Sequence, residues 1–223
     1  MAYRLYYSPG ACSMAVHIAL EEIGVPFELE LVLSRGEREG AMTATDAWRA
    51  VNPKGRIPAL APVAGSAGGA AELLTEVPAI LLYLALEHEE AGLLPEDAAS
   101  RARAAEWMNW LSGNVHAMAY GQIWRAQRFS DDEAALDSIR ARGRANLADH
   151  HRYVERLLGD GRKWALPSGY SVVDPYLLVF FQWGQRIGLA MRRDCPAWSA
   201  ATDRILARPA VQRVLEREGI AIA

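Results

Sequence analysis

A cysteine lies at the predicted junction between the first strand and the first helix of the chain. The stretch from Leu5 to His17 reads LYYSPGACSMAVH, in which an apolar run meets a Ser-Pro-Gly turn and then Cys12. A helix N-terminus carries unpaired N–H groups and the positive end of the helix dipole, and both favour an anion. A thiol there commonly has a lowered pKa, so Cys12 is a candidate thiolate or a neighbour of a bound thiolate. The alternative is a small buried apolar residue, the usual role of an isolated cysteine.

The surrounding residues limit the chemistry that Cys12 can perform. The motif is Cys12-Ser13-Met14-Ala15, with no second cysteine, and the only other cysteine, Cys195, lies far along the chain. An internal dithiol cycle is therefore excluded, and redox chemistry would need an external thiol. We expect a structural role for Cys195. The histidines show no metal-ligand spacing, so we expect no metal.

Two further positions could contact a ligand. Glu76 lies at another predicted strand-to-helix junction, where a carboxylate either complements the helix dipole or helps to bind a ligand beside free N–H groups. Pro58 precedes a predicted strand and indicates a bulge or an edge; a cis Ile57-Pro58 bond is allowed but uncommon.

Residues 102–127 are predicted to form one helix with two contrasting sides. A narrow polar stripe on one side is either solvent surface or the wall of a cleft. Its members are Asn109, Gly113, His116 and Tyr120, and the opposite, apolar side carries Trp107, Leu111, Val115 and Met118.

The elements that must position these residues fall into two groups. The first 80-odd residues read β-α-β-α-β-β-α, with a right-handed parallel β-α-β unit followed by an antiparallel hairpin. From about Ala98 onward the pattern predicts helices only. We therefore expect an α/β domain over residues 1–86, a linker over 87–97 and an all-α domain over 98–223.

Two helices of the predicted all-α domain have start signals. A capping box at Ser130–Glu133 predicts a helix that ends near Leu158 and Gly159. A similar cap at Ser171–Asp174 precedes PYLLVFFQW, an apolar run that predicts a helix buried at the centre of a bundle.

Composition excludes several classes of function. The 223 residues are 51% hydrophobic and 23% charged, with a formal net charge of -3, so neither nucleic acid nor a membrane is an expected partner. No apolar run reaches the length of about 20 residues that spans a bilayer. With two distant cysteines and no leader pattern, we expect a reduced, cytoplasmic protein.

Taken together, these motifs resemble the cytosolic glutathione transferases, most closely their bacterial beta class. The resemblance extends over essentially the whole chain. It is carried by LYYSPGACSMAVHIALEE, NPKGRIPAL, LLTEVPAILLYLA, EWMNWLSGNVH, SVVDPYLL and RPAVQRVLEREGI, in that order.

The resemblance implies a thioredoxin-like N-terminal domain, a helical domain and a homodimer, with glutathione as co-substrate. It implies a cis Ile57-Pro58 bond, with the Ile57 backbone pairing to the cysteinyl part of glutathione. Glu76 and the N–H of Val77 are then expected at the γ-glutamyl end. Cys12 would lie beside the glutathione sulfur, with Ser13 as an alternative hydroxyl donor.

Other positions follow from the same resemblance. His116 matches a histidine that faces the sulfur, and Asn109 a polar contact one stripe above it. The basic residue after the second strand is Arg38, with Arg35 as the alternative. The chain departs from the family at Val77, where a Ser or Gly is usual, and at Ala117, where a lysine is common.

The function implied is conjugation of the glutathione thiolate to small hydrophobic electrophiles, a detoxification activity. Two alternatives stay open. Cys12 could instead support a glutathione-dependent thiol–disulfide reductase or peroxidase. The chain could also be a non-catalytic protein that binds glutathione or another ligand.

Overall fold

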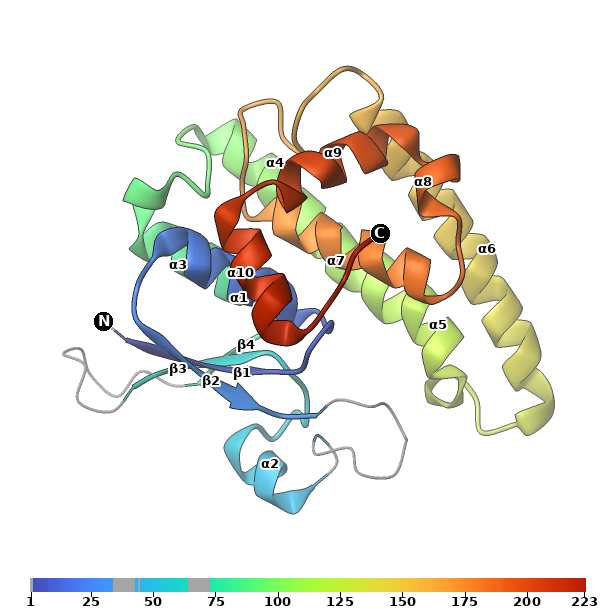
Figure 1. Cartoon of the computed structure of the whole chain (residues 1–223). Coiled ribbons are helices and arrows are strands. Elements are labelled where there is room, and N and C mark those ends of the chain that lie inside the picture. The colour runs from blue at the N-terminus through green and yellow to red at the C-terminus, as the bar shows by residue number, and fades with distance from the viewer. Residues whose placement is uncertain (1, 34–42, 44, 64–72) are drawn as a thin grey trace.

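The computed structural model describes residues 2–33, 43, 45–63 and 73–223 (Figure 1). Within these ranges the N-terminal elements follow the predicted order of strands and helices. They are β1 (Tyr3–Tyr7), α1 (Ser13–Ile23), β2 (Phe27–Leu31), α2 (Asp46–Val51), β3 (Ala59–Pro62), β4 (Leu74–Thr75) and α3 (Val77–Glu87).

The strands form one four-stranded sheet in the order β2-β1-β3-β4. β1 pairs parallel to β2, with Leu5 opposite Leu29, and antiparallel to β3, with Leu5 opposite Leu60. β3 and β4 are antiparallel. The predicted parallel unit and hairpin are therefore both confirmed.

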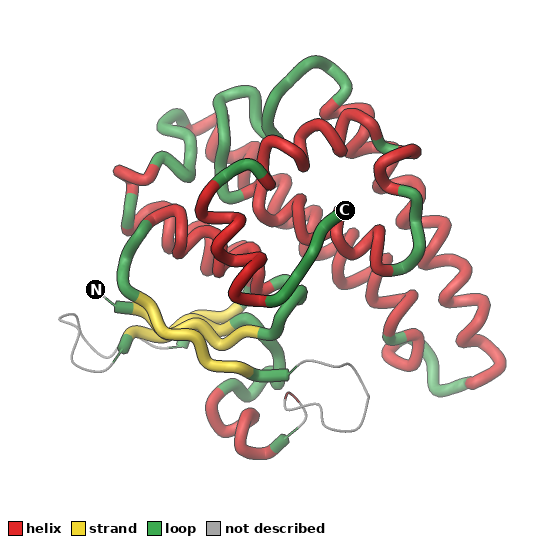
Figure 2. The backbone as a smooth tube through the Cα atoms, viewed as in Figure 1, coloured by secondary structure: helices red, strands yellow, loops and turns green. Residues whose placement is uncertain are grey.

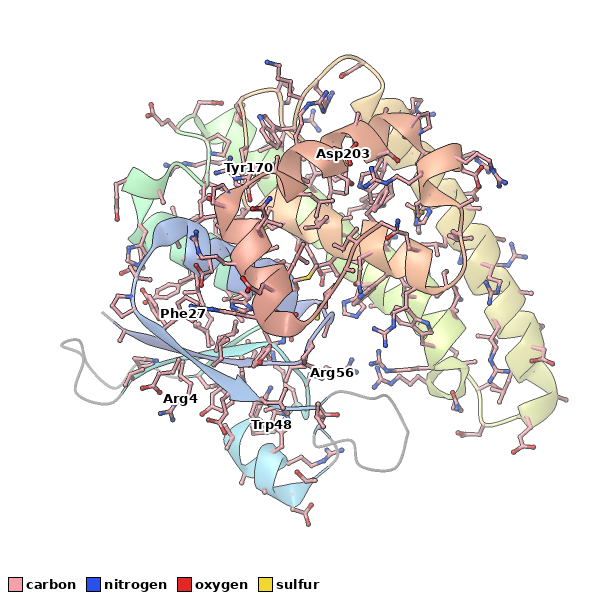
Figure 3. All side chains as sticks on the ribbon, viewed as in Figure 1. Arg4, Phe27, Trp48, Arg56, Tyr170 and Asp203 are labelled. Atoms are coloured by element: carbon pink, nitrogen blue, oxygen red, sulfur yellow. The ribbon has the colours of Figure 1, made fainter. Side chains whose placement is uncertain are left out.

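Helices cover the sheet on its two faces (Figures 1 and 2). α1 packs against α3 and against the later helices α7 and α10, and its residues from Ser13 to Leu20 are all buried. On the other face lies α2, whose Trp48 points to the sheet and packs with Val32 and Ala59 (Figure 3). This is a thioredoxin-like domain.

The second half of the described chain is helical. Its elements are η2 (Glu89–Ala91), α4 (Ala98–Trp110), η3 (Leu111–Tyr120), α5 (Gly121–Trp124), η4 (Ala126–Arg128), α6 (Glu133–Leu158), α7 (Val173–Arg186), α8 (Met191–Asp194), α9 (Pro196–Leu206) and α10 (Pro209–Glu218). α7 runs through the middle of this assembly, with every residue from Val173 to Phe181 buried, as its apolar sequence predicts (Figure 1). Among the described residues, no helix has both the length and the apolar character needed to cross a membrane.

The predicted long helix over residues 102–127 is not a uniform α-helix. Between α4 and α5 the chain forms a π-helix, η3, which has more residues per turn than an α-helix and so rotates the residues that follow. Met118, expected on the apolar side, is 46% exposed, whereas Tyr120, expected on the polar stripe, is fully buried. The two-sided pattern inferred from α-helical spacing therefore holds as far as Val115, which is buried, and is wrong at Met118 and Tyr120.

Of the two predicted helix caps, the one at the start of α6 is wrong and the one at the start of α7 agrees with the structure. α6 ends at Leu158 as expected, but its N-cap is Asp132, which accepts a hydrogen bond from the Ala134 N–H at 3.0 Å. The predicted Ser130 cap is wrong, because its hydroxyl accepts from the Asp132 N–H instead. At the start of α7, buried Asp174 accepts hydrogen bonds from the N–H groups of Ser171 and Ala165, each at 2.8 Å.

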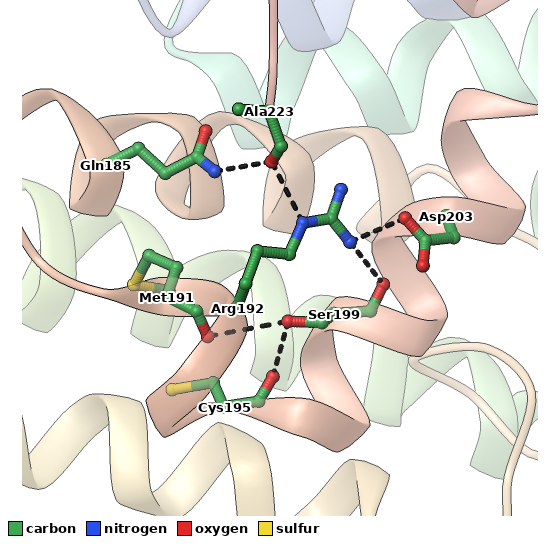
Figure 4. A network of polar contacts seen from close by, with 7 residues as sticks. All are labelled: Gln185, Met191, Arg192, Cys195, Ser199, Asp203 and Ala223. Carbon is green, nitrogen blue, oxygen red and sulfur yellow. Dashed lines mark hydrogen bonds and ion pairs between the residues drawn. The ribbon is translucent and has the colours of Figure 1, made fainter.

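Cys195 lies in a network that holds the C-terminal helices together (Figure 4). Its carbonyl accepts a hydrogen bond from the Ser199 hydroxyl at 2.7 Å. Arg192 links this region to Asp203 and to the Ala223 carbonyl. The thiol of Cys195 is buried, in agreement with a structural role.

Candidate functional site

A cleft of about 1050 Å³ separates the sheet domain from the helical half. Its N-terminal wall consists of the turn after β1, the loop before β3 and the start of α3; its helical wall comes from η3, the segment from α5 to Phe129, and α7. Ligand pockets usually measure roughly 300–1,000 Å³, so this cleft has room for a tripeptide and a second small molecule. The structure brings Cys12, Ile57, Pro58, Glu76, Val77 and His116 together in its lining.

Cys12 is buried at the floor of the cleft. Its thiol donates a hydrogen bond to the Ile57 carbonyl, with a sulfur–oxygen distance of 3.7 Å. Burial raises the pKa of the thiol to about 12, and the nearby Arg125 guanidinium lowers the pKa only in part. The expectation of a lowered pKa is therefore wrong for this conformation, because removal from water outweighs the start of α1.

Ser13 does not reach the cleft. Its side chain is fully buried, and its hydroxyl donates to the Ser8 carbonyl at 3.1 Å while accepting from the Ser8 N–H at 3.2 Å. The hydroxyl therefore stabilises the turn between β1 and α1. The structure does not place Ser13 in the cleft lining, and its role as a donor to a ligand sulfur stays a prediction.

The turn that carries Cys12 is held from behind by the helical half, which sequence analysis missed. Gly10, with a φ of +65°, donates its N–H to Glu218 at 2.9 Å and accepts from the Trp183 indole at 2.8 Å. The other oxygen of Glu218 contacts Nδ1 of His17 at 2.8 Å, and both side chains are fully buried. These contacts span most of the chain, so no local pattern indicates them.

The start of α3 presents a charged pair. Glu76 is the single non-glycine residue with positive φ among the described residues, at +74°, and it is the N-cap of α3 without a side-chain cap bond. Its carboxylate forms a 2.9 Å ion pair with Lys54, and both side chains are more than half exposed. Such a backbone conformation costs roughly 1–3 kcal/mol for a residue with a Cβ. Val77 is buried behind it, and both residues line the cleft, so the start of α3, where helix N–H groups lack intrahelical partners, belongs to its wall.

Beside this pair, the Ile57-Pro58 peptide bond is cis, as the resemblance implies. Pro58 is buried, and both residues line the cleft. The backbone of Ile57 is therefore next to the Cys12 sulfur, which its carbonyl contacts.

His116 faces the cleft from η3. Its ring packs edge-on against Trp183 at 4.8 Å between centroids. Burial, together with the charges of Arg125, Arg56 and Arg128, lowers the pKa of His116 to about 3. The imidazole is therefore neutral at pH 7 and can act through one N–H donor and one acceptor nitrogen, but not as a cation.

Tyr176 is a second residue that sequence analysis missed. It comes from the buried face of α7 and lines the cleft, with its hydroxyl beside Ser112 but without a well-formed hydrogen bond to any described residue. Burial raises its pKa well above the usual value, so it keeps its proton. The signal available in the sequence was the tyrosine hydroxyl within the apolar run PYLLVFFQW.

Two predicted contacts are not part of the described lining. The Asn109 side chain is exposed on α4 and donates to the Ala105 carbonyl at 2.9 Å, so the structure does not bring it into the cleft of this chain. Arg38 and its alternative Arg35 both lie outside the described residues.

Within the described ranges, no three His, Cys, Asp or Glu side chains converge in a way that could hold a metal ion. The chemistry of the cleft instead depends on sulfur, imidazole, hydroxyl and guanidinium groups.

The fold and the cleft define a class: a thioredoxin-like domain, with a cis-proline loop and an exposed helix N-terminus, facing an all-helical domain. The family model for the glutathione S-transferase N-terminal domain matches residues 10–87. The glutathione S-transferase GstA of Escherichia coli O157:H7 is 32% identical over 218 residues, 97% of this chain and 99% of that protein. The chain therefore belongs to the glutathione S-transferase family of enzymes.

Solved structures agree with this assignment. A glutathione transferase homologue from Sulfitobacter, solved with bound glutathione, has a TM-score of 0.87 and 28% identity, covering 98% of this chain and 99% of that one. A bacterial beta class enzyme from Sphingomonas chungbukensis has a TM-score of 0.80 and 31% identity, covering 98% of this chain and 100% of its own. The resemblance to the beta class is thereby confirmed.

Proposed function

We propose that this enzyme conjugates the thiolate of glutathione to small electrophiles with an apolar body, and so contributes to detoxification. One observation carries the proposal: the start of α3, the Ile57-Pro58 loop, Cys12 and His116 line a single cleft that is large enough for both substrates. The family assignment supports glutathione as the co-substrate.

In this proposal the N-terminal wall binds glutathione. The γ-glutamyl end lies at Glu76, whose carboxylate accepts from the ligand amine, and at the Val77 N–H, which donates to the ligand carboxylate. The cysteinyl part pairs with the backbone of Ile57. This places the glutathione sulfur near Cys12 and opposite His116. Arg38 or Arg35 remains the proposed contact for the remaining carboxylate.

The chemical task is to increase the fraction of thiolate. A thiol with a pKa of about 8.5 is only a few per cent ionised at pH 7. Because His116 is neutral, it stabilises the thiolate as a hydrogen-bond donor to the sulfur and not as a cation paired with it. The Arg125 guanidinium already favours an anion at Cys12, so it favours a neighbouring thiolate as well.

The decisive test is the Cys12→Ser variant. A serine hydroxyl can still donate to the Ile57 carbonyl. The variant should therefore conjugate chlorodinitrobenzene at a rate within about threefold of that of the wild-type protein, a change in activation free energy of less than about 1 kcal/mol. The measurement is the initial rate of thioether formation, with the melting temperature as the control for folding. Loss of all conjugation in Cys12→Ser, at an unchanged melting temperature, would contradict the proposal.

The same variant addresses the reductase alternative. The raised pKa of Cys12 keeps its thiol protonated at pH 7, which disfavours attack on a disulfide. We therefore expect the intact mass of the purified protein to be the same before and after treatment with a reductant. A reductant-sensitive gain of one glutathione, lost in Cys12→Ser, would instead favour the reductase or peroxidase. Binding of glutathione with no turnover would favour the ligand-binding alternative.

The proposal includes a homodimer in the cytoplasm and the division into domains at residues 87–97. Analytical sedimentation measures whether the protein is a dimer. Limited proteolysis between α3 and α4 tests the division into domains.

A further inference from the structure

The charge of the cleft is uneven. Among the described residues that line it, five side chains are cationic and one is a carboxylate. The carboxylate, Glu76, forms an ion pair with Lys54 at one end. The other cations are Arg56, Arg125, Arg128 and Arg186, so the described lining has an excess of guanidinium groups, three of them from the helical half.

Helix ends explain only part of this cluster. An arginine at a helix C-terminus complements the helix dipole, which accounts for Arg186 at the end of α7 and for Arg125 directly after α5. Arg128 ends the short η4, and Arg56 lies in the loop before β3, on the side of the sheet domain that faces α5 (Figure 3). Three segments that are distant in sequence, the loop before β3, residues 125–128 and the end of α7, thus contribute guanidinium groups to the lining of the same cleft.

The effect of these groups on their neighbours indicates where the positive field is strongest. After burial, the charges of Arg125, Arg56 and Arg128 lower the pKa of His116. Arg125 also acts on the buried Cys12, and its own side chain is only half-exposed. The field therefore reaches the position at which the two substrates meet, where solvent screens it less than at the surface.

Aromatic rings lie beside these charges. Trp124 packs edge-on against Trp183 at 4.9 Å between centroids, and Trp183 packs against His116. The guanidinium of Arg186 lies 6.0 Å from the centre of the Trp124 ring. This part of the cleft thus combines flat apolar surfaces with groups that bind carboxylates in a bidentate manner.

We propose that the electrophile of this enzyme carries a carboxylate, which Arg125, Arg128 and Arg186 bind while its apolar body packs on Trp124 and Trp183. The inference rests on the proposed conjugation and specifies its substrate class. With chlorodinitrobenzoate, the thiol proton of glutathione leaves to solvent and the sulfur lone pair forms a bond to the carbon that carries chlorine. The carbon–chlorine bond then breaks, and chloride leaves with the electron pair.

The experiment compares chlorodinitrobenzoate with chlorodinitrobenzene, which reacts at the same kind of carbon but has no carboxylate. The readout is the ratio of kcat/KM for the acid to kcat/KM for the neutral compound, relative to the uncatalysed reactions, at saturating glutathione. Glutathione binding and thiolate formation are common to both reactions and cancel in this ratio. We expect the ratio to favour the acid and to fall at least about tenfold in the Arg125→Gln/Arg128→Gln double variant, because a charge-assisted hydrogen bond contributes about that much.

A matched control separates the cluster from overall charge. Arg193 is an exposed arginine on α8, paired with Asp194 and outside the described lining, so Arg193→Gln should leave the ratio unchanged. An unchanged ratio in the double variant, or an equal fall in Arg193→Gln, would overturn the proposal.

Binding provides a readout that does not need turnover. Trp124 and Trp183 line the cleft, so a bound nitroaromatic compound quenches their fluorescence. Dinitrobenzoate should quench at lower concentration than dinitrobenzene, and the double variant should remove this difference. If neither chlorinated compound reacts but this difference is present, the proposed function fails while the carboxylate site stands. If the difference is absent, the carboxylate site fails.

Discussion

The N-terminal wall of the cleft takes its shape from turns and a cis peptide bond of the backbone, whereas the helical wall is lined by large side chains. At the N-terminal wall lie the cis Ile57-Pro58 peptide, the first turn of α3 and the turn after β1. At the helical wall lie His116, Tyr176, two tryptophans and several arginines. A wall shaped by the backbone keeps its form when surface side chains change, whereas a wall of side chains changes with each substitution.

The N-terminal wall depends on the helical half for its shape. Glu218 of α10 and Trp183 of α7 hold the two polar groups of the Gly10 peptide, two residues before Cys12. The two walls are therefore mechanically connected, although the proposed function assigns them different ligands.

The largest expected effect comes from breaking that connection. Glu218→Ala leaves the Gly10 N–H and the buried His17 without their partner, and loss of one member of a buried pair costs about 3–5 kcal/mol. For a chain of this size, this corresponds to a fall in Tm of roughly 10 °C. Thermal unfolding measures it, and Glu218→Gln, which keeps an acceptor oxygen, should lose less. A fall in Tm for Glu218→Ala no larger than that of Glu218→Gln would show that the pair does not stabilise the turn.

The next largest effect is expected at the N-terminal wall, from removal of the Glu76 carboxylate. Glu76→Ala removes the carboxylate proposed for the ligand amine, so glutathione affinity should fall roughly tenfold to a hundredfold, about 1.5–3 kcal/mol. Calorimetric titration with glutathione measures the loss.

Glu76→Gly is the matched variant, since it removes the same carboxylate at a positive φ that glycine adopts readily. It should weaken glutathione binding as much as Glu76→Ala while melting at a higher temperature. Unchanged affinity in both variants would remove Glu76 from the site.

The smallest effect concerns the helical wall. His116→Ala should lower kcat for conjugation about tenfold, or about 1.4 kcal/mol. Since the pKa of His116 is about 3, the imidazole does not change charge between pH 5 and pH 9. The one ionisation in the pH profile should therefore be that of bound glutathione, shifted to higher pH in His116→Ala because the thiolate has lost a hydrogen-bond donor. The ratio of the rates of the two proteins should be constant below both thiol pKa values and narrow above them, and equal thiol pKa values in the two proteins would contradict a role of His116 at the sulfur.

Sequence reasoning predicted the N-terminal wall more completely than the helical wall. The order of strands and helices, the cis Ile57-Pro58 bond and the location of Cys12 and Glu76 in one cleft all agree with expectation. These features depend on short motifs at element boundaries, where proline, glycine and helix termini restrict the backbone locally.

The errors share a physical cause, which is that the environment of a side chain depends on elements far away in the sequence. The pKa of Cys12 is raised by burial rather than lowered at the helix start. The π-helix η3 has more residues per turn than an α-helix, so by its end Tyr120 is buried and Met118 is exposed, the reverse of the prediction.

The sequence by itself determined the two-part architecture and the family, because hydrophobic periodicity and boundary motifs are local properties of the chain. Tertiary structure alone decided three features: the Glu218–Gly10–Trp183 contacts, the neutral state of His116 and the group of arginines beside the aromatic rings. Each depends on charges or hydrogen-bonding groups from distant segments, whose interaction energies are set by separation in space and by exclusion of water.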